Sequence, residues 1–245
     1  MKYSYHSHTR WCRHATGEIE DYIEEAICNH LQLFTICDHI MDDHAHFGPR
    51  APWSNYPEYI MAVEKAEDKY QGRIELLRGF EAEYYPNMMS KYQEIRKKDN
   101  ISVWILGQHE SADRTINYYK MKDFEADTIQ YKNDVLEGLS TGFFQILAHP
   151  DLTILNYRKP LPVLLDCMDE IFAYCEAHDI IVEINANGIR GNKAYPDKTV
   201  WELSKRYRLR YIVSSDAHSP DALCDQYVDK AEVFARNLDI KLDNV

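Results

Sequence analysis

The sequence predicts an α/β protein whose parallel strands, each followed by a helix, close into a (β/α) barrel. Three observations support this: apolar runs of strand length, segments of helical periodicity between them, and a length of 245 residues that suits one barrel. A glycine-rich phosphate loop, which would favour an open nucleotide-binding sheet, is missing from the sequence. Repeats and linkers are missing too, so we expect residues 1–245 to form a single domain.

Seven short apolar runs rich in β-branched and aromatic residues are the predicted strands. They are Tyr3 to Tyr5, Leu33 to Cys37, Ile74 to Phe80, Ile101 to Leu106, Phe143 to Leu147, Ile180 to Ile184 and Tyr211 to Val213. Between them lie five predicted helices. The first carries apolar residues at helical spacing from Ile19 to Leu31 and starts at Thr16, followed by acidic residues. The other predicted helices are 56–70, 122–139, 160–177 and 199–207.

Composition and charge exclude several classes of protein. Hydrophobic residues make up 45% and charged residues 28%, as in ordinary globular proteins. A net charge of −12 argues against a nucleic-acid partner, which needs clustered Lys and Arg, and no apolar run is long enough to span a membrane. Six cysteines without a Cys-x-x-Cys pair or a signal peptide indicate reduced thiols and a cytoplasmic location. The oligomeric state stays open.

Imidazole and carboxylate side chains occur where the predicted strands end. They are His6, His8, His14, His39, Glu81, His109, His149, Asp216 and His218. In a barrel these strand ends converge on the face where active sites are built. The spacing of His6 and His8 puts both rings on one side of a strand, and Asp216 and His218 have the same spacing. Either pair alone often arises by chance, but such residues at six strand ends predict a metal centre.

Nine potential ligands are too many for one ion. An open catalytic ion needs three or four protein ligands, so we expect two or three ions that share a bridging carboxylate. Mixed imidazole and carboxylate ligands suit Zn, Mn or Fe better than Ca or Mg. The absence of a Cys cluster argues against a structural thiolate site or an iron–sulfur centre. The remaining histidines, at positions 30, 44, 46 and 178, are expected to have structural roles.

The ordered motifs of the chain resemble those of the polymerase-and-histidinol-phosphatase (PHP) superfamily, and within it the stand-alone histidinol-phosphatases. These motifs are HSH, CRHA, CDH, GFEAEYYP, LGQHE, AHPDL, EINANGIRG and SSDAH. The resemblance extends from His6 to His218 and implies a distorted seven-stranded barrel with a trinuclear metal centre. Two positions depart from the family pattern. Ser4 stands where Asp is frequent, so a supporting hydrogen bond is expected to be absent or replaced, and Glu110 stands where an apolar residue is usual.

The resemblance also implies three ligand sets. The first is His6, His8, Glu81 and Asp216; the second is Glu81, His109 and His149; the third is His14, His39 and His218. Glu81 would then bridge the first two ions.

The leading functional hypothesis is a phosphoric monoester hydrolase that acts on L-histidinol phosphate in histidine biosynthesis. Metal ions would lower the pKa of bound water and offset charge on the phosphoryl oxygens, and a metal-bridged hydroxide would attack phosphorus. The expected catalytic residues are Glu81, Asp216 and His218, with Asp216 or a metal-bound histidine assisting proton transfer.

Four further residues are the expected substrate contacts. The resemblance implies a phosphate-binding guanidinium at Arg190, after the sixth strand, and Arg158 is the second choice. A surface salt bridge is the alternative role for both arginines. Glu83 and Glu110 are candidates for binding the amine and imidazole of the substrate.

Three alternatives remain open. A PHP-type hydrolase could act on another small phosphoester, a phosphodiester or a phosphotyrosyl protein. An amidohydrolase-type barrel also begins with His-x-His, but it uses a carboxylated Lys where this chain has Glu81 and His109. A non-catalytic metal-binding module would be expected to have lost ligands, whereas this chain keeps all nine.

Overall fold

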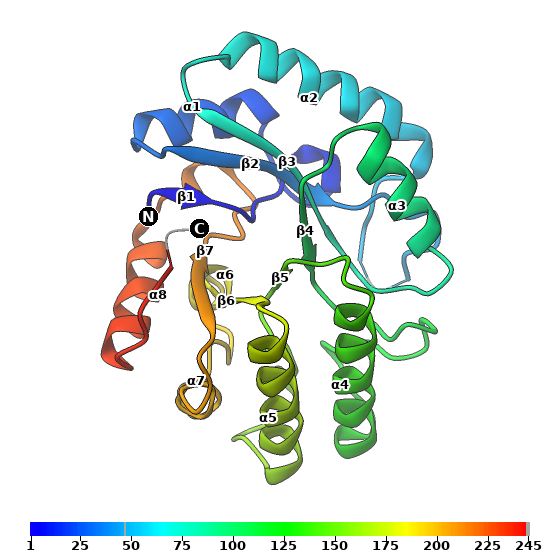
Figure 1. Cartoon of the computed structure of the whole chain (residues 1–245), viewed down its shortest axis with the longest axis vertical. Helices are drawn as coiled ribbons and strands as arrows, with labels where there is room; N and C mark the ends of the chain where they lie inside the picture. The colour runs from blue at the N-terminus through cyan, green and yellow to red at the C-terminus, as the bar shows by residue number, and fades with distance from the viewer. Residues whose placement is uncertain (47, 244–245) are drawn as a thin grey trace.

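A computed structural model describes residues 1–46 and 48–243 and confirms the predicted barrel. Seven parallel strands lie side by side in chain order, and the helices surround them (Figure 1). Every predicted apolar run overlaps one strand. The strands are β1 (Tyr3–Ser4), β2 (Leu33–His39), β3 (Glu75–Ala82), β4 (Val103–Leu106), β5 (Ile146–Leu147), β6 (Ile181–Asn185) and β7 (Arg210–Ser214).

The first and last strands meet just beyond their carboxyl ends. The backbone N–H of Asp216 donates to the carbonyl of His6 over 3.1 Å, and that of His8 donates to the carbonyl of Ala217 over 2.7 Å. A parallel bridge between Ser7 and Ala217 belongs to the same contact. The barrel is therefore closed by backbone that carries three of the predicted metal ligands.

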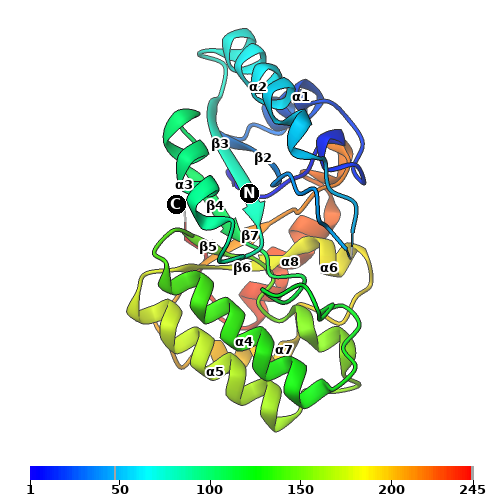
Figure 2. The same ribbon diagram turned by 90° about the vertical axis from the view of Figure 1, so that its right-hand side faces the viewer.

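Five helices lie where the sequence predicts them. They are α1 (Ile19–Cys28), α2 (Tyr56–Tyr70), α4 (Phe124–Ser140), α5 (Pro162–Ala177) and α7 (Lys198–Ser204). The predicted start of α1 at Thr16 is wrong: Glu18 is the N-cap, and its backbone N–H donates to the Asp21 carboxylate over 2.8 Å. The helices α4 and α5 pack against each other outside the barrel (Figure 2).

Three helices were not expected from the sequence. They are α3 (Met89–Lys98), α6 (Ala186–Arg190) and α8 (Gln226–Asn237). The helix α3 is largely polar and buries only Tyr92 and Ile95, so it has no clear apolar stripe. The helix α6 is too short for periodicity to be visible. None of the described helices is long and apolar enough to cross a membrane.

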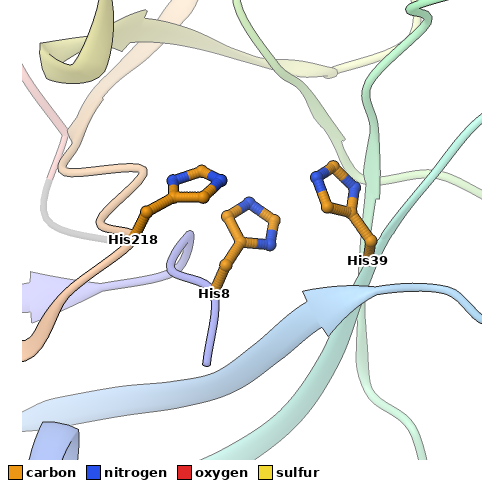
Figure 3. Close-up of side chains that lie close together, drawn as sticks. All are labelled: His8, His39 and His218. Carbon is orange, nitrogen blue, oxygen red and sulfur yellow. The ribbon is translucent and has the colours of Figure 1, made fainter. Parts of the chain in front are cut away.

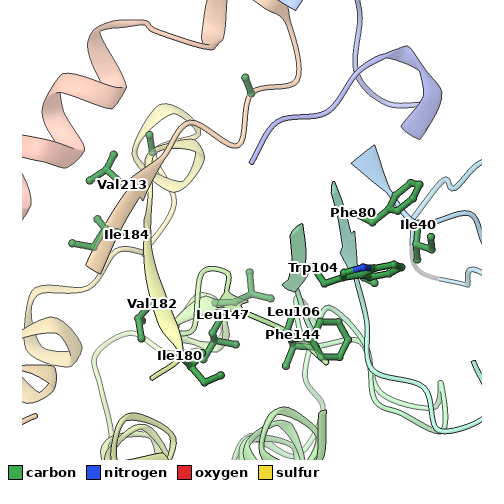
Figure 4. Close-up of a cluster of buried hydrophobic side chains, with 14 of the residues drawn as sticks. Ile40, Phe80, Trp104, Leu106, Phe144, Leu147, Ile180, Val182, Ile184 and Val213 are labelled. Carbon is green, nitrogen blue, oxygen red and sulfur yellow. The ribbon is translucent and has the colours of Figure 1, made fainter. Parts of the chain in front are cut away.

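Apolar side chains pack on both faces of the barrel strands, in two clusters. The larger packs the outer faces of the strands against the helices and includes Phe80, Trp104 and Leu106 (Figure 4). The smaller fills the inside of the barrel and consists of Cys37, Val103, Ile105, Ile146, Ala148 and Ile212. Side chains of a strand alternate between faces, so His39 lies on the same inward face as Cys37, one layer closer to the carboxyl ends. The interior is thus apolar below and carries ligand-type side chains above.

Candidate metal centre

The nine sequence-predicted ligands come together at the carboxyl ends of the strands. His39 and Glu81 lie within β2 and β3, and the others follow strands in the loops. Seven of them are buried: His6, His8, His39, Glu81, His109, His149 and Asp216. His14 is exposed and His218 half-buried, so the third ligand set lies nearest to solvent.

The first ligand set forms a compact group of four donor atoms. The Nε2 atoms of His6 and His8 are 3.0 Å apart, and Oε2 of Glu81 is 3.3 Å from each. Asp216 Oδ1 is 3.2 Å from Nε2 of His8 and 3.7 Å from Nε2 of His6. Ligand atoms about 2.1 Å from a tetrahedral ion are about 3.4 Å from one another. The four side chains therefore fit a single divalent ion.

Glu81 faces two ligand sets with different oxygens. Its Oε2 belongs to the first set, whereas Oε1 is 3.0 Å from Nε2 of His149 and 3.4 Å from Nε2 of His109. The carboxylate rests against Gly107, where a Cβ atom would come within 2.6 Å of the Glu81 carboxyl carbon. Glycine thus leaves room for the carboxylate between the two sets, as a bridging ligand requires.

The third ligand set is arranged around His8. The His8 ring centroid is 4.2 Å from that of His39 and 4.5 Å from that of His218, and the three rings lie in a row (Figure 3). The His14 ring is 4.9 Å from His218 and 5.2 Å from His39. Nδ1 of His39 lies 2.9 Å from Glu81 Oε2. The three residues of the third set therefore lie close together, and His8 and Glu81 of the first set lie beside them.

Four of the predicted ligands have a buried nitrogen or oxygen atom without a hydrogen-bond partner among the described residues. These atoms are Oδ1 of Asp216 and Nδ1 of His8, His39 and His149. Oδ1 of Asp216 and Nδ1 of His39 face other ligand atoms, at 3.2 Å from Nε2 of His8 and 2.9 Å from Oε2 of Glu81. Buried polar atoms are normally hydrogen-bonded, so such atoms at the centre of a ligand cluster fit metal binding. The other oxygen of Asp216 accepts hydrogen bonds of 3.1 Å from the amides of Asn185 and Asn187. These amides fix the carboxylate and leave Oδ1 directed at the ligands.

Electrostatics favour the metal-binding protonation states of Glu81, His14 and His218. Burial lowers the pKa values of His6, His8 and His149, but neighbouring carboxylates raise them above the usual range. Burial raises the pKa of Glu81, but the surrounding His39, His6 and His109 lower it well below its usual range. Burial, together with the charge of His8, lowers the pKa of His14 to about 4 and that of His218 to about 3. At neutral pH the carboxylate is ionised and these two imidazoles are neutral, as binding to a metal demands.

Hydrogen bonds behind the ligands orient their rings. Nδ1 of His6 donates to Glu183 over 2.6 Å, and Nδ1 of His109 donates to Glu83 over 2.9 Å. Sequence reasoning missed Glu183; the available signal was an acidic residue within an otherwise apolar strand. The hydroxyl of Ser4 is buried without a hydrogen-bond partner among the described residues. Glu183 therefore supports His6 in a protein that has no Asp at position 4.

Two ligands also have an uncommon backbone conformation. His149 has a φ of 31° and Asp216 a φ of 43°, in the left-handed region that residues other than glycine rarely adopt. Such conformations persist where the surroundings enforce them and concentrate at functional sites. At these strand ends the His149 side chain lies against Glu81 and the Asp216 side chain against His8.

A cavity of about 310 Å³ opens above the ligands. Glu81, His14, His39, His109, Asp216 and His218 line its floor and walls, together with Glu83, Glu110, Arg50, Tyr85, Tyr119, Asn187 and Lys193. The predicted contacts Glu83 and Glu110 are therefore beside the metal ligands. Sequence reasoning missed Arg50 and Lys193, because nothing in their loops marks them as neighbours of the strand ends.

The structure places Arg190 and Arg158 outside the cavity lining, and their assignment as phosphate-binding residues stays a prediction. The Arg190 guanidinium donates to both carboxylate oxygens of Asp225, at 2.7 and 3.1 Å, and to the carbonyls of Ser215 and Ala222. It thus connects α6 to the start of α8 and does not line the cavity. Arg158 is exposed and lies outside the cavity lining. The contacts of Arg190 with Asp225 agree with its salt-bridge alternative.

The barrel and its clustered ligands define a class of (β/α)-barrel proteins that hold metal ions at their strand ends. Residues 4–187 match the PHP domain, and the chain belongs to the PHP domain family.

Several known proteins are similar over nearly the whole chain. The chain is 23% identical to a probable histidinol-phosphatase of Schizosaccharomyces pombe, over 95% of the chain and 88% of the relative. It is 24% identical to a probable histidinol-phosphatase of Deinococcus radiodurans, over 91% and 89%.

Two solved structures share the fold. The putative histidinol phosphatase of Listeria monocytogenes superposes with a TM-score of 0.78 at 17% identity, covering 93% of this chain and 99% of that one. The histidinol phosphate phosphatase of Lactococcus lactis, solved with zinc, L-histidinol and phosphate, gives 0.75 at 18% identity, covering 98% and 95%.

Proposed function

We propose that the chain is a metal-dependent phosphomonoesterase that hydrolyses L-histidinol phosphate in histidine biosynthesis. One observation carries the proposal: Glu81 lies at the floor of a cavity with imidazole nitrogens within 3.4 Å of each of its oxygens. Relatives named as probable histidinol-phosphatases match more than nine-tenths of the chain and support the choice of substrate. The Lactococcus lactis neighbour was solved with histidinol and phosphate, which also supports it.

The proposed cofactor is two or three divalent ions of Zn, Mn or Fe. The zinc of the Lactococcus lactis neighbour favours zinc among them. The first and second ligand sets would hold two ions that share Glu81, and the third set would hold another. When bound, these ions lower the pKa of water and offset the charge on the phosphoryl oxygens.

The residues of the chain would then have separate roles. Glu81 holds the first two ligand sets at a fixed spacing because each of its oxygens faces one of them. Burial raises the pKa of Asp216, but His6, His8 and His218 lower it well below its usual range. Asp216 and His218 both line the cavity and are the residues that we assign to proton transfer.

One wall of the cavity suits a positively charged amine. Arg114 donates to both Asp42, at 2.6 Å, and Glu110, at 3.2 Å, so two carboxylates share one guanidinium. Tyr85 also donates a hydrogen bond to Glu110. The excess negative charge on this wall would attract the ammonium group of histidinol phosphate while its phosphate lies over the metal ligands.

A comparison of substrates tests the proposal. Protein loaded with Zn or Mn is assayed for phosphate release from histidinol phosphate, an aryl phosphate, a phosphotyrosyl peptide and a phosphodiester. We expect the highest kcat/KM for histidinol phosphate. Faster turnover of another compound would make the chain a PHP hydrolase of that phosphoester. A small-molecule substrate and a cytoplasmic location, without nucleic-acid or membrane partners, belong to the same proposal.

A further inference from the structure

We infer that Arg50, in the loop between β2 and α2, is the residue that binds the phosphate group of the substrate. The inference rests on the proposed phosphatase function and assigns a role to a residue outside the motifs of the chain. Among the described residues that line the cavity, there is one arginine, Arg50, and one lysine, Lys193. The Arg50 side chain is only 10% exposed, so its charge is held inside the cavity and away from bulk water.

The guanidinium of Arg50 keeps unused donors. One terminal nitrogen donates to Oε1 of Glu83 over 2.9 Å, and the other donates to the carbonyl of Pro49 over 3.1 Å. A guanidinium carries five N–H groups. The Nε–H of Arg50 and its remaining terminal N–H groups make no hydrogen bond within residues 1–46 and 48–243. These groups are available to a phosphate, which a guanidinium can bind through two parallel hydrogen bonds.

Glu83 connects Arg50 to the metal centre. The same oxygen, Oε1, accepts the hydrogen bond from Arg50 and the one from Nδ1 of His109, both at 2.9 Å. Burial raises the pKa of Glu83, but Arg50 and His109 lower it to about 2, so this carboxylate stays ionised. Glu83 is therefore a positioning residue: it fixes Arg50 relative to a ligand of the second set. This replaces its predicted role as an amine contact.

Arg50 is a positive charge beside the ligand sets. It shares Glu83 with His109 and lines the same cavity as His39. A phosphate seated over Glu81 would meet this charge on the side of the cavity formed by the loop. The other cations are less suited. Lys193 is exposed and donates to the Tyr195 hydroxyl over 3.1 Å, and Arg190 is committed to Asp225.

Phosphate binding to the zinc-loaded protein tests the assignment. Inorganic phosphate is titrated calorimetrically into the wild type, Arg50→Met, Arg50→Lys and the control Arg206→Met, whose side chain is 70% exposed and outside the cavity. We expect Arg50→Met to weaken phosphate binding at least about tenfold and to raise KM more than it lowers kcat. Arg50→Lys should weaken phosphate binding severalfold, because an ammonium group cannot form the two parallel hydrogen bonds of a guanidinium. The control variant should bind phosphate as the wild type does.

Two outcomes overturn the assignment. One is wild-type phosphate affinity in Arg50→Met, or in Arg50→Lys if the methionine variant does not fold. The other is an affinity that falls in Arg190→Met but not in the Arg50 variants. Either result leaves the phosphatase function intact if the wild type hydrolyses a phosphomonoester. A zinc-loaded wild type that neither binds phosphate nor hydrolyses any phosphomonoester contradicts the proposed function itself.

Discussion

The imidazole of His6 and the carboxylate of Glu183 form a buried hydrogen bond in which Nδ1 donates to Oε1 over 2.6 Å. The other oxygen of Glu183 accepts the backbone N–H of His149 over 3.0 Å. Burial raises the pKa of Glu183, but His6 and His149 lower it, which keeps the carboxylate ionised. One side chain on β6 thus orients a residue of the first ligand set and the backbone of a residue of the second.

Replacing Glu183 with Gln should weaken metal binding. The amide keeps the size of the side chain but removes the charge that orients His6, and such a loss typically costs about 10- to 100-fold in metal affinity. Competition with a chromophoric chelator measures the affinity for zinc. Glu58→Gln, at an exposed position of α2, is the matched control. Equal zinc affinity in both variants would show that Glu183 does not support the site.

Replacing Gly107 with Ala should displace Glu81. The added methyl group would overlap the Glu81 carboxylate, and the Val103 to Leu106 strand that precedes Gly107 gives the backbone little freedom to move. A displacement of about 1 Å at a reacting centre costs about 100-fold in rate. The measurement is kcat together with zinc content, and circular dichroism checks the fold. Activity within a factor of about three of the wild type would rule out this role for the glycine.

Replacing Glu81 with Gln should remove more activity than the loss of one histidine. Each Glu81 oxygen faces a different ligand set, whereas His149 belongs only to the second. We expect Glu81→Gln to lower the metal content in both sets and His149→Asn to lower it in one. Metal content and phosphate release are measured on both variants at equal protein concentration. A larger loss in His149→Asn would contradict the bridging role.

Replacing Glu110 with Gln should reduce discrimination for the amine. The variant removes one of the two carboxylates that share Arg114 and leaves the bond from Arg114 to Asp42. We expect KM for histidinol phosphate to rise about fivefold, equivalent to about 1 kcal/mol, while KM for an aryl phosphate stays constant. Equal increases for both substrates would mean that Glu110 does not recognise the ammonium group.

The sequence predicts the strands and the clustering of imidazole and carboxylate residues at their carboxyl ends, because both depend on local patterns. Apolar runs mark all seven strands, and all the predicted ligands except His14 lie within a few residues of the end of a run. The helix α3 is not predicted from the sequence because its buried face is too small to produce an apolar periodicity. The contacts of the residues around the ligands could not be predicted for a different reason. Whether Arg190 faces a phosphate or pairs with Asp225 depends on contacts across 35 residues, which spacing does not reveal.

The same limit explains the positions of Arg50 and Glu83. The loop that carries Arg50 has no strand or helix pattern that would direct it over the barrel mouth, and its bond to Glu83 spans 33 residues. The sequence motif that contains Glu83 could be recognised, but the hydrogen bond between Glu83 and Arg50 could not be predicted from it. Local patterns therefore predict which residues can bind metal, and the tertiary structure decides which residues are left to bind the substrate.

The most direct test of a multinuclear phosphatase is the metal content of the purified protein measured together with phosphate release. Elemental analysis after loading with Zn or Mn, with histidinol phosphate as substrate, provides both values on one sample. The three ligand sets predict two or three ions per chain and phosphate release that a chelator abolishes and added metal restores. Fewer than two ions per chain, with no phosphatase activity after metal addition, would contradict the central claim.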